Sequence, residues 1–414
     1  MSDTKDLLLR TKSASRTLQS ISDEKRVEVL KHLSEAIMSH IPYLLSANAG
    51  DLSRMDPSNP LYDRLKLDES RLSSIATDML SVSSLPSPLG RILSDTIRPN
   101  GLRIRKVTVP YGVIGIIYEA RPNVTFDVFS LCFKSGNACI LKGGRDASGS
   151  NGAAVRLIKE VLENDGISPD VINMVDATHE AAGELLSATG LVDLVIPRGG
   201  RKLIDFVRNN AKVPCIETGA GVVDAYFDAD GNLETGKRVI CNSKTRRVSV
   251  CNALDCLIVH SARLSDLPEL LSTMRNVTIF ADERAYASLE GNYPADLLER
   301  ANLDSFGTEF MSYKLAVKTV DSIDEALEHI SIYGSGHSET IVTENDEAAT
   351  RFQMEVDAAC VYVNAPTSFS DGAQFGLGAE IGISTQKLGA RGPMGLEELA
   401  TYKWLVNGNG QVRE

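Results

Sequence analysis

Residues 113–145 read VIGIIYEARPNVTFDVFSLCFKSGNACILKGGR and contain two short apolar runs. The runs, at 113–118 and 138–141, lack polar alternation, which is typical of strands that are buried on both faces. Helical spacing between them, at 123–134, indicates a strand, a helix and a second strand of one parallel sheet. Ligands of such sheets bind beyond the carboxyl ends of the strands, so the residues that follow each run are candidates for a site.

The same pattern extends through most of the chain. More strands are predicted at 171–175, 192–196 and 213–216, with helices at 147–163, 179–188 and 200–210. Further apolar runs follow at 254–259, 277–280, 315–320, 340–343 and 359–363, and helical spacing covers 5–84. A chain of 414 residues exceeds the size of a single core, so we expect an α/β fold with two domains and mainly parallel sheets.

An exposed arm is predicted next to the first sheet. Residues 102–109, LRIRKVTV, alternate apolar with polar side chains, which is the pattern of a strand with one solvated face. We predict a β-hairpin arm at 95–110 that joins a C-terminal tail at 390–414. Because such an arm and tail bury little by themselves, a homo-oligomer, either a dimer or a tetramer, is expected.

Composition disfavours several classes of protein. A net charge of -12 argues against a nucleic-acid-binding surface. No apolar run reaches the roughly 20 residues that span a bilayer, and the N-terminus lacks the order of a secretory signal. A cytoplasmic location without membrane attachment is therefore expected. The seven cysteines have no Cys-x-x-Cys spacing, which predicts reduced thiols and no metal site.

Two glycine turns follow predicted strands and open predicted helices. They are Lys142-Gly143-Gly144-Arg145 and Pro197-Arg198-Gly199-Gly200. Glycine lets a ligand approach the backbone, and the N-terminus of a helix favours the phosphate groups of a dinucleotide. Neither turn is a dinucleotide fingerprint, and each alone is better explained as a tight turn between a strand and a helix.

Cys251 ends a run that contains three cations, Asn242-Ser-Lys-Thr-Arg-Arg-Val-Ser-Val-Cys251. Lys244, Arg246 and Arg247 could stabilise the thiolate, which is the nucleophilic form of cysteine, or hold an anionic substrate. On local sequence alone, an inert cysteine that fills space is an equal interpretation. The cations are also explained as the solvated basic end of a helix.

Asn123 follows the strand at 113–118 and begins a predicted helix. Its side chain could cap that helix or present an amide to a ligand. Beside a cysteine thiolate, this amide and the backbone N–H of Cys251 would form an oxyanion hole.

Five segments together carry a family resemblance: 113–125, 140–145, 196–200, 242–252 and 379–395. Through them the chain resembles, over nearly its whole length, the glutamate-5-semialdehyde dehydrogenase (gamma-glutamyl phosphate reductase) family of the aldehyde dehydrogenase superfamily. The resemblance implies an aldehyde-dehydrogenase-like fold and NADPH-dependent reduction of L-glutamyl 5-phosphate in proline biosynthesis. The domains would be 1–94 with 111–220 for NADP, 95–110 with 390–414 for oligomerisation, and 221–389 for catalysis.

The resemblance also implies roles for individual residues. Cys251 would be the nucleophile, and Asn123 the oxyanion donor. The residues assigned to NADP(H) are Lys142, Gly143, Arg145, Gly199, Gly200 and Glu309. Those assigned to the substrate, glutamyl 5-phosphate, are Lys244, Arg246, Arg247 and Phe369. Glutamate 5-kinase, which makes this acyl phosphate, is the candidate protein partner.

Two other hypotheses stay open. Glu217, in Ile216-Glu-Thr-Gly-Ala-Gly, resembles the glutamate that activates water in hydrolytic aldehyde dehydrogenases, and it would then act as a general base. A redox sensor that oxidises Cys251 reversibly is a non-enzymatic hypothesis. The chain also departs from the family pattern at Val223-Asp224, where members commonly carry a Cys-His pair. This loss leaves Cys251 as the favoured nucleophile.

Overall fold

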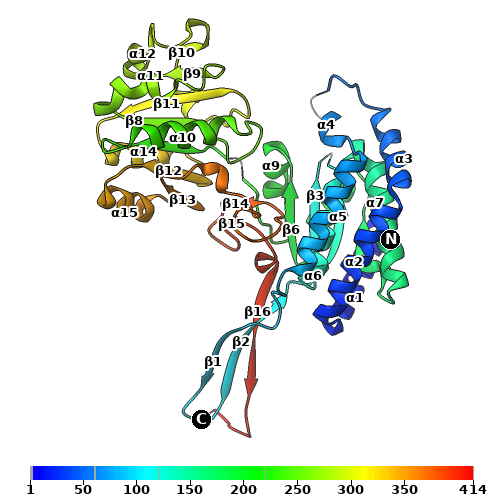
Figure 1. Ribbon diagram of the computed structural model, residues 1–414. Coiled ribbons are helices and arrows are strands. Elements are labelled where there is room, and N and C mark those ends of the chain that lie inside the picture. The colour runs from blue at the N-terminus through cyan, green and yellow to red at the C-terminus, as the bar shows by residue number, and fades with distance from the viewer. Residues whose placement is uncertain (1–2, 60–61, 120, 220, 414) are drawn as a thin grey trace. The chain divides into compact units, whose positions relative to one another are not determined.

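The computed structural model describes residues 3–59, 62–119, 121–219 and 221–413. The chain forms two compact units (Figure 1). The first unit comprises Met1–Thr218, Gly376–Gly382 and Met394–Glu414, and the second comprises Gly219–Phe375 and Ile383–Pro393. Residues 376–382, which the predicted catalytic domain includes, thus group with the first unit.

The first unit is built on a four-stranded parallel sheet in the order β5-β4-β3-β6. Its strands are β3 (Val113–Tyr118), β4 (Ala138–Lys142), β5 (Ile172–Met174) and β6 (Leu194–Arg198). The helices between and after them are α6 (Asn123–Lys134), α7 (Ser148–Asn164), α8 (His179–Leu186) and α9 (Arg201–Asn210). Every residue of β3 is buried, which confirms the predicted strand–helix–strand arrangement of 113–145.

Helices at the N-terminus cover this sheet and its helices. They are α1 (Asp3–Thr17), α2 (Asp23–Ser39), α3 (Ile41–Leu52), α4 (Tyr62–Leu65) and α5 (Glu69–Ser84). Helix α1 packs on β4 and β5, while α2 and α5 pack on each other and on α6. Ser22 accepts the N–H of Lys25 and so begins α2 at the predicted N-cap.

The second unit contains a seven-stranded parallel sheet in the order β10-β9-β11-β8-β7-β12-β13. Its strands are β7 (Asp224–Phe227), β8 (Cys256–His260), β9 (Thr278–Ala281), β10 (Leu298–Arg300), β11 (Lys314–Val320), β12 (Ser338–Val342) and β13 (Cys360–Val363). Leu257 and Val259 join one buried cluster and Cys256 and Ile258 another, because alternate residues of β8 face opposite sides of the sheet.

Helices accompany this second sheet. They are α10 (Leu233–Thr245), α11 (Leu267–Leu270), α12 (Glu283–Leu289), α13 (Leu303–Phe306), α14 (Ile323–Tyr333) and α15 (Asp346–Glu355). A short pair, β14 (Ile383–Ser384) and β15 (Gly392–Pro393), belongs to the same unit. Among the described residues, no helix combines the length and the apolar character needed to cross a bilayer.

The arm is a three-stranded antiparallel sheet in the order β1-β2-β16 (Figure 1). Its strands are β1 (Ile92–Ile97), β2 (Arg103–Pro110) and β16 (Ala400–Asn407). Large side chains are exposed on it, including Ile97 at 74% and Trp404 at 55%. The C-terminal tail therefore joins the hairpin as its third strand.

Two expectations about strands differ from the structure. Within residues 213–216, Cys215 makes an isolated bridge to Val195 and no regular strand forms, because Pro214 has no N–H to donate to a ladder. The structure also contains strand β7, which the apolar runs do not predict, because its first residue, Asp224, interrupts the apolar run.

Candidate active site

The carboxyl end of β4 carries the first glycine turn. Lys142 is the last residue of β4 and pairs in register with Ile117 of β3. Its side chain is half-buried, and burial, together with the charge of Arg145, lowers the pKa of its ammonium group. At Gly143 an added Cβ would lie 2.4 Å from Nδ2 of Asn151 on α7. The missing side chain thus lets the turn pack closely against α7.

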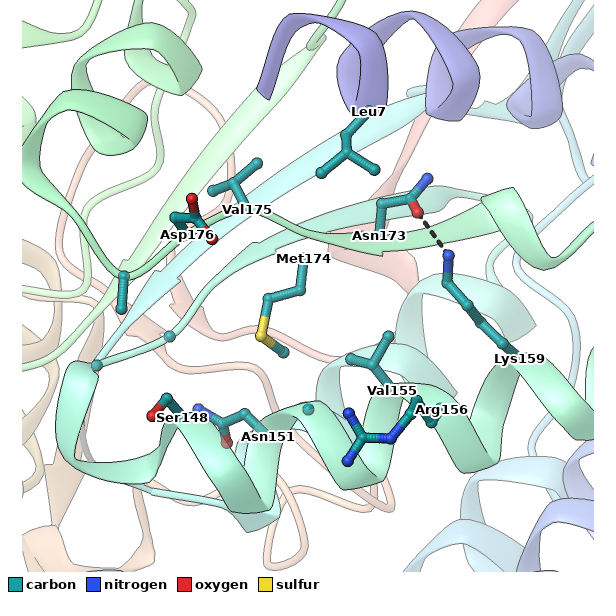
Figure 2. Close-up of a pocket in the computed structure, with 14 residues that line it drawn as sticks. Leu7, Ser148, Asn151, Val155, Arg156, Lys159, Asn173, Met174, Val175 and Asp176 are labelled. Atoms are coloured by element: carbon teal, nitrogen blue, oxygen red, sulfur yellow. Dashed lines mark hydrogen bonds between the residues drawn. The ribbon is translucent and has the colours of Figure 1, made fainter. Parts of the chain in front are cut away.

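A pocket of about 400 Å³ opens beside this turn within the first unit (Figure 2). It lies between α7 and the carboxyl ends of β4 and β5. Its lining includes Gly143, Gly144, Asn151, Arg156, Lys159 and Asp176. In Figure 2, Met174 lies between an end marked by Ser148 and Asp176 and an end marked by Lys159.

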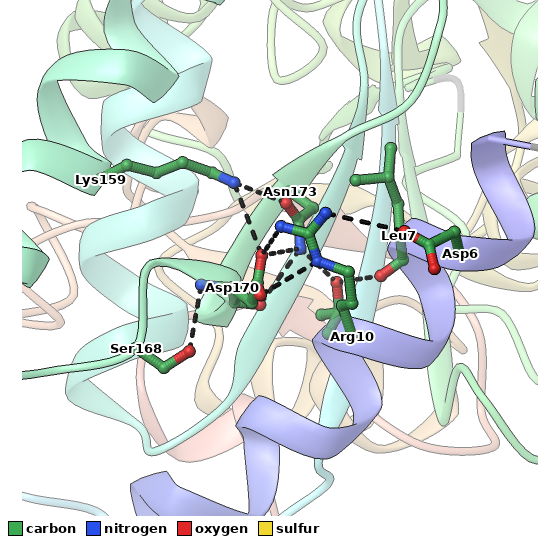
Figure 3. Close-up of polar contacts among 8 residues, drawn as sticks. Asp6, Leu7, Arg10, Lys159, Ser168, Asp170 and Asn173 are labelled. Carbon is green, nitrogen blue, oxygen red and sulfur yellow. Dashed lines mark hydrogen bonds and ion pairs between the residues drawn. The ribbon is translucent and has the colours of Figure 1, made fainter.

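Polar contacts among α1, α7 and the start of β5 fix one end of this pocket (Figure 3). Arg10 donates to both carboxylate oxygens of Asp170, at 2.6 and 3.1 Å, and this bonding lowers the pKa of Asp170. Lys159 donates to Oδ1 of Asn173 at 2.6 Å and lies 3.8 Å from Asp170. These bonds hold Lys159 and Asn173, which both line the pocket, in fixed positions.

The second glycine turn precedes α9. The N–H of Gly200 donates to Oε2 of Glu119 at 3.2 Å, so a carboxylate already lies at the N-terminus of this helix. At Gly199 an added Cβ would lie 2.7 Å from Leu203 and 2.8 Å from Glu119. A cofactor phosphate at this N–H would therefore have to replace the carboxylate of Glu119.

Asn123 is the first residue of α6, and Pro122, not Asn123, occupies the N-cap position. The interpretation of Asn123 as a helix cap is therefore wrong. Its Nδ2 donates instead to Oδ2 of Asp127, one turn later, at 2.9 Å. Burial raises the pKa of Asp127 to about 7, against the opposing effect of the Asn123 bond. Since an amide nitrogen carries two hydrogens, the second can serve another acceptor.

Glu217, the base of the hydrolytic hypothesis, is paired with Arg208. Its Oε2 accepts from Nε of Arg208 at 2.8 Å and from a terminal guanidinium nitrogen at 2.5 Å. These two charge-assisted bonds hold the carboxylate against the guanidinium of Arg208.

Cys251, in the second unit, packs against the backbone at Gly221. A Cβ added at Gly221 would lie 1.8 Å from the carbonyl oxygen of Cys251, so only glycine fits. The N–H of Gly221 donates to Oε1 of Glu309 at 3.2 Å. Cys251 itself is partly exposed. The structure thus brings Cys251 and Glu309, which were predicted from separate motifs, to one glycine.

The loop that carries Phe369 is attached to the residue after the cysteine. Nδ2 of Asn252 donates to the carbonyl oxygen of Ser370 at 2.9 Å, and the carbonyl oxygen of Asn252 accepts from Oγ1 of Thr367 at 2.9 Å. Phe369 lies between these two anchors and is 44% exposed. The predicted substrate residue is therefore held on a loop bonded to Asn252.

Lys244 requires a correction. It is fully buried, donates to the carbonyl oxygen of Leu254 at 2.7 Å and lies 3.8 Å from Asp255. Burial lowers the pKa of Lys244 to about 8 and raises the pKa of Asp255 to about 7. These contacts contradict its predicted role in substrate binding, because the cation is sealed inside the second unit. Arg246 and Arg247 are exposed.

Three further residues contact predicted site residues: Glu119, Asp127 and Gly221. Asp127 had a detectable signal, since it lies four residues after Asn123 and so shares one face of α6. Glu119 and Gly221 reach their partners only through the tertiary fold, which local spacing does not show.

Named relatives resemble the chain over its full length. It is 59% identical to gamma-glutamyl phosphate reductase of Parabacteroides distasonis over 411 residues, which is 99% of each chain. It is 57% identical to gamma-glutamyl phosphate reductase of Pelodictyon phaeoclathratiforme, over 98% of each chain. The chain belongs to the gamma-glutamyl phosphate reductase family. The resemblance carried by the five sequence segments is thereby confirmed.

Solved structures support the same gamma-glutamyl phosphate reductase fold. The crystal structure of gamma-glutamyl phosphate reductase from Thermotoga maritima is 38% identical, covers 100% of both chains and gives a TM-score of 0.96. An acetylating aldehyde dehydrogenase from Geobacillus thermoglucosidasius, 18% identical over 100% of this chain and 98% of that one, shares the fold with a TM-score of 0.71. The predicted aldehyde-dehydrogenase-like fold is confirmed. No protein-family model matches the chain.

Proposed function

We propose that this chain reduces L-glutamyl 5-phosphate to L-glutamate 5-semialdehyde, with release of phosphate, as a step of proline biosynthesis. One observation carries the proposal. A partly exposed cysteine, Cys251, has its backbone against Gly221, whose N–H donates to Glu309, in a chain that is 59% identical to a named gamma-glutamyl phosphate reductase. A cysteine suits an acyl phosphate, because the acyl group transfers to sulfur while phosphate leaves.

Cys251 acts as the nucleophile in its thiolate form. Its sulfur bonds to the γ-carbonyl carbon, the bond from that carbon to the phosphate oxygen breaks, and a thioester on Cys251 remains. When bound, a nicotinamide cofactor supplies the hydride that reduces this thioester. Collapse of the thiohemiacetal then frees the aldehyde and returns the Cys251 thiolate. Phosphate is a good leaving group, so the first step needs no strong general acid.

Other residues of the chain bind and orient. Asn123 gives its second amide hydrogen to the acyl oxygen, on which negative charge develops during attack. The hydrogen bond to Asp127 orients the side chain of Asn123 so that its amide nitrogen, rather than its amide oxygen, faces the acyl oxygen. The exposed cations Arg246 and Arg247 recognise the phosphate and carboxylate groups of the substrate, and Phe369 contacts its carbon chain.

The pocket beside Lys142 suits the adenosine part of NADP(H). Its volume of about 400 Å³ lies in the range of ligand pockets, and the side-chain-free backbone of Gly143 forms part of its wall. Lys142 and Arg145 supply two positive charges for the 2′-phosphate, which favours NADPH over NADH. Gly199 and Gly200 would lie along the cofactor, and Glu309 would hold the nicotinamide ribose.

Hydrolysis through Glu217 is not favoured, because the guanidinium of Arg208 occupies the carboxylate that would have to accept a proton from water.

Partners follow from the arm and from the substrate. We propose that exposed side chains of the arm, among them Ile97 and Trp404, are covered by a second copy of the chain in a dimer or tetramer. Because an acyl phosphate hydrolyses readily, glutamate 5-kinase is the proposed partner that delivers it. A cytoplasmic location, where thiols stay reduced, completes the proposal.

The reverse reaction tests this function. The protein is incubated with NADP⁺ and pyrroline-5-carboxylate, with and without inorganic phosphate, and NADPH is followed by absorbance. We expect steady NADPH formation that depends on phosphate and is lost in Cys251→Ala. Steady formation without phosphate would contradict the proposal and support hydrolysis through Glu217. Reversible thiol oxidation without turnover would support the redox sensor.

A further inference from the structure

Four side chains that commonly bind metals gather inside the second unit. They are Asp224 of β7, Cys256 of β8, Glu339 of β12 and His329 of α14. Asp224, Cys256 and Glu339 are 0% exposed, and His329 is 5% exposed. Neighbouring parallel strands bring three of them together, since Asp224 is in register with both Cys256 and Glu339. The proposed reaction uses none of them, so the cluster needs an explanation of its own.

The spacing of the ligand atoms suits one metal ion. A carboxylate oxygen of Asp224, Sγ of Cys256 and a ring nitrogen of His329 all lie within 4.8 Å of one another. Sγ of Cys256 and Nε2 of His329 are 3.6 Å apart. A tetrahedral Zn²⁺, with Zn–S near 2.3 Å and Zn–N near 2.0 Å, would place sulfur and nitrogen about 3.6 Å apart.

Of the four carboxylate oxygens in the cluster, three are buried without a hydrogen-bond donor among the described residues. Both side-chain oxygens of Asp224 and Oε1 of Glu339 have no hydrogen-bond partner among the residues described. Oδ2 of Asp224 and Oε1 of Glu339 both border Gly334, since they lie 3.2 and 3.4 Å from the place that a Cβ would take there. Oε2 of Glu339 accepts the N–H of Asp224 at 2.7 Å. Buried carboxylates of this kind are strongly unfavourable unless a cation or a proton neutralises them.

Two other acidic groups show the contrast. Asp255, also buried, lies 3.8 Å from Nζ of Lys244 and accepts the N–H of Phe310 at 3.0 Å. Asp165, whose side chain is 7% exposed, accepts from Nζ of Lys25 at 2.8 Å. Protein donors already satisfy both of these carboxylates, whereas no donor among the described residues reaches the oxygens of Asp224.

We propose that Asp224, Cys256 and His329 bind a structural Zn²⁺ ion, with Glu339 beside Asp224 at the edge of the site. Thiolate sulfur and imidazole nitrogen select Zn²⁺ over Mg²⁺ and Ca²⁺, which prefer oxygen. Binding displaces the thiol proton of Cys256, which passes to solvent, and forms the bond from zinc to the thiolate. All three ligands are buried, so a substrate has no access to the ion, which joins β7 and β8 to α14 rather than acting in catalysis.

Metal content tests the proposal on the intact protein. The wild-type chain is produced with zinc in the medium, dialysed against EDTA without denaturation, and measured by elemental mass spectrometry. We expect zinc in a one-to-one ratio with the chain. Protein refolded with Co²⁺ in place of zinc should show a thiolate-to-cobalt charge-transfer band in the near ultraviolet. Metal-free protein in both experiments would overturn the proposal and indicate that a shared proton neutralises Asp224 and Glu339.

Variants identify the ligands. Cys256→Ser should lose zinc and the charge-transfer band, whereas Cys360→Ser, at another buried cysteine of the same sheet, should keep both. Asp224→Asn should weaken zinc binding by at least about tenfold. Zinc retained at full content in Cys256→Ser would overturn the assignment. If Cys256→Ser does not fold, the wild-type cobalt spectrum decides, since bound cobalt without a thiolate band would also overturn it.

Discussion

The turn at Gly143 and the turn at Gly221 both bring backbone close to a site residue, but they are held differently. At Gly143 the nearest atom to an added Cβ is Nδ2 of Asn151, the end of a flexible side chain on the following helix. At Gly221 it is the backbone carbonyl oxygen of Cys251, which cannot move without moving the nucleophile. The cofactor side of the chain is therefore adjustable, and the cysteine side is rigid. Substitutions in the two regions should differ accordingly.

The largest effect is expected at the nucleophile itself. Cys251→Ala should lower kcat by about 10⁴-fold or more, because no other group can form the thioester. Steady-state rates of NADPH formation measure the loss. Cys241→Ala, which removes another partly exposed thiol of the second unit, is the matched control and should keep its rate. Equal loss in both variants would show that Cys251 has no special role.

Loss of the amide at Asn123 comes next. Asn123→Ala should reduce kcat by about 10²–10³-fold, because one donor to the developing oxyanion is removed. The KM for the substrate should change far less. An unchanged kcat in this variant would show that Asn123 is not an oxyanion donor. The proposed role of the first unit would then be cofactor binding alone.

The two glycines give the direct comparison. Gly221→Ala should lower kcat by about 10²-fold, since displacement of the cysteine loop misplaces the sulfur. Gly143→Ala should leave kcat nearly unchanged and raise the KM for NADPH by about tenfold, because Asn151 can move aside. Gly183→Ala, where an added Cβ meets nothing within 4 Å, is the control for both. Similar kinetics for Gly221→Ala and Gly143→Ala would break the distinction between a rigid and an adjustable side.

The smallest effect concerns the pH dependence of stability. The folded-state pKa of Asp127, about 7, is above its unfolded value of about 3.9. The stability that Asp127 contributes as a neutral acid is therefore complete below about pH 4 and is lost as the pH rises through about 7. Asp127→Asn should abolish this loss, which we expect to be about 1–2 kcal/mol between pH 6 and pH 8. Denaturant unfolding at both pH values measures it, and equal pH dependence in both proteins would contradict the assignment.

Local patterns in the sequence predicted much of the first unit. The apolar runs of β3 and β4 and the glycine turn after Lys142 lie within a single stretch, so their spacing shows the strand, the helix and the strand end. The cations before Cys251 indicate the region of the nucleophile. The predicted role of Lys244 in substrate binding is wrong, because a lysine in a basic run shows no sign in the sequence of being buried against Asp255.

Long-range contacts account for what the sequence did not show. Gly221 contacts both Cys251 and Glu309 through the tertiary fold, and no spacing rule in the sequence connects the three residues. The cluster of Asp224, Cys256 and His329 is even harder to predict from the sequence, because Cys-x-x-Cys spacing indicates metal ligands only where they lie close together in the chain. Register between parallel strands brings Asp224 and Cys256 together, and helix α14, far along the chain, adds His329.

The central claim is that Cys251 carries the acyl group while phosphate leaves or attacks. Rapid mixing of the protein with NADP⁺ and pyrroline-5-carboxylate in the absence of phosphate tests it directly. The account predicts a burst of NADPH that is stoichiometric with Cys251, then no further turnover until phosphate is added, since the thioester has no acceptor. A reaction without a burst, or steady turnover without phosphate, would contradict it.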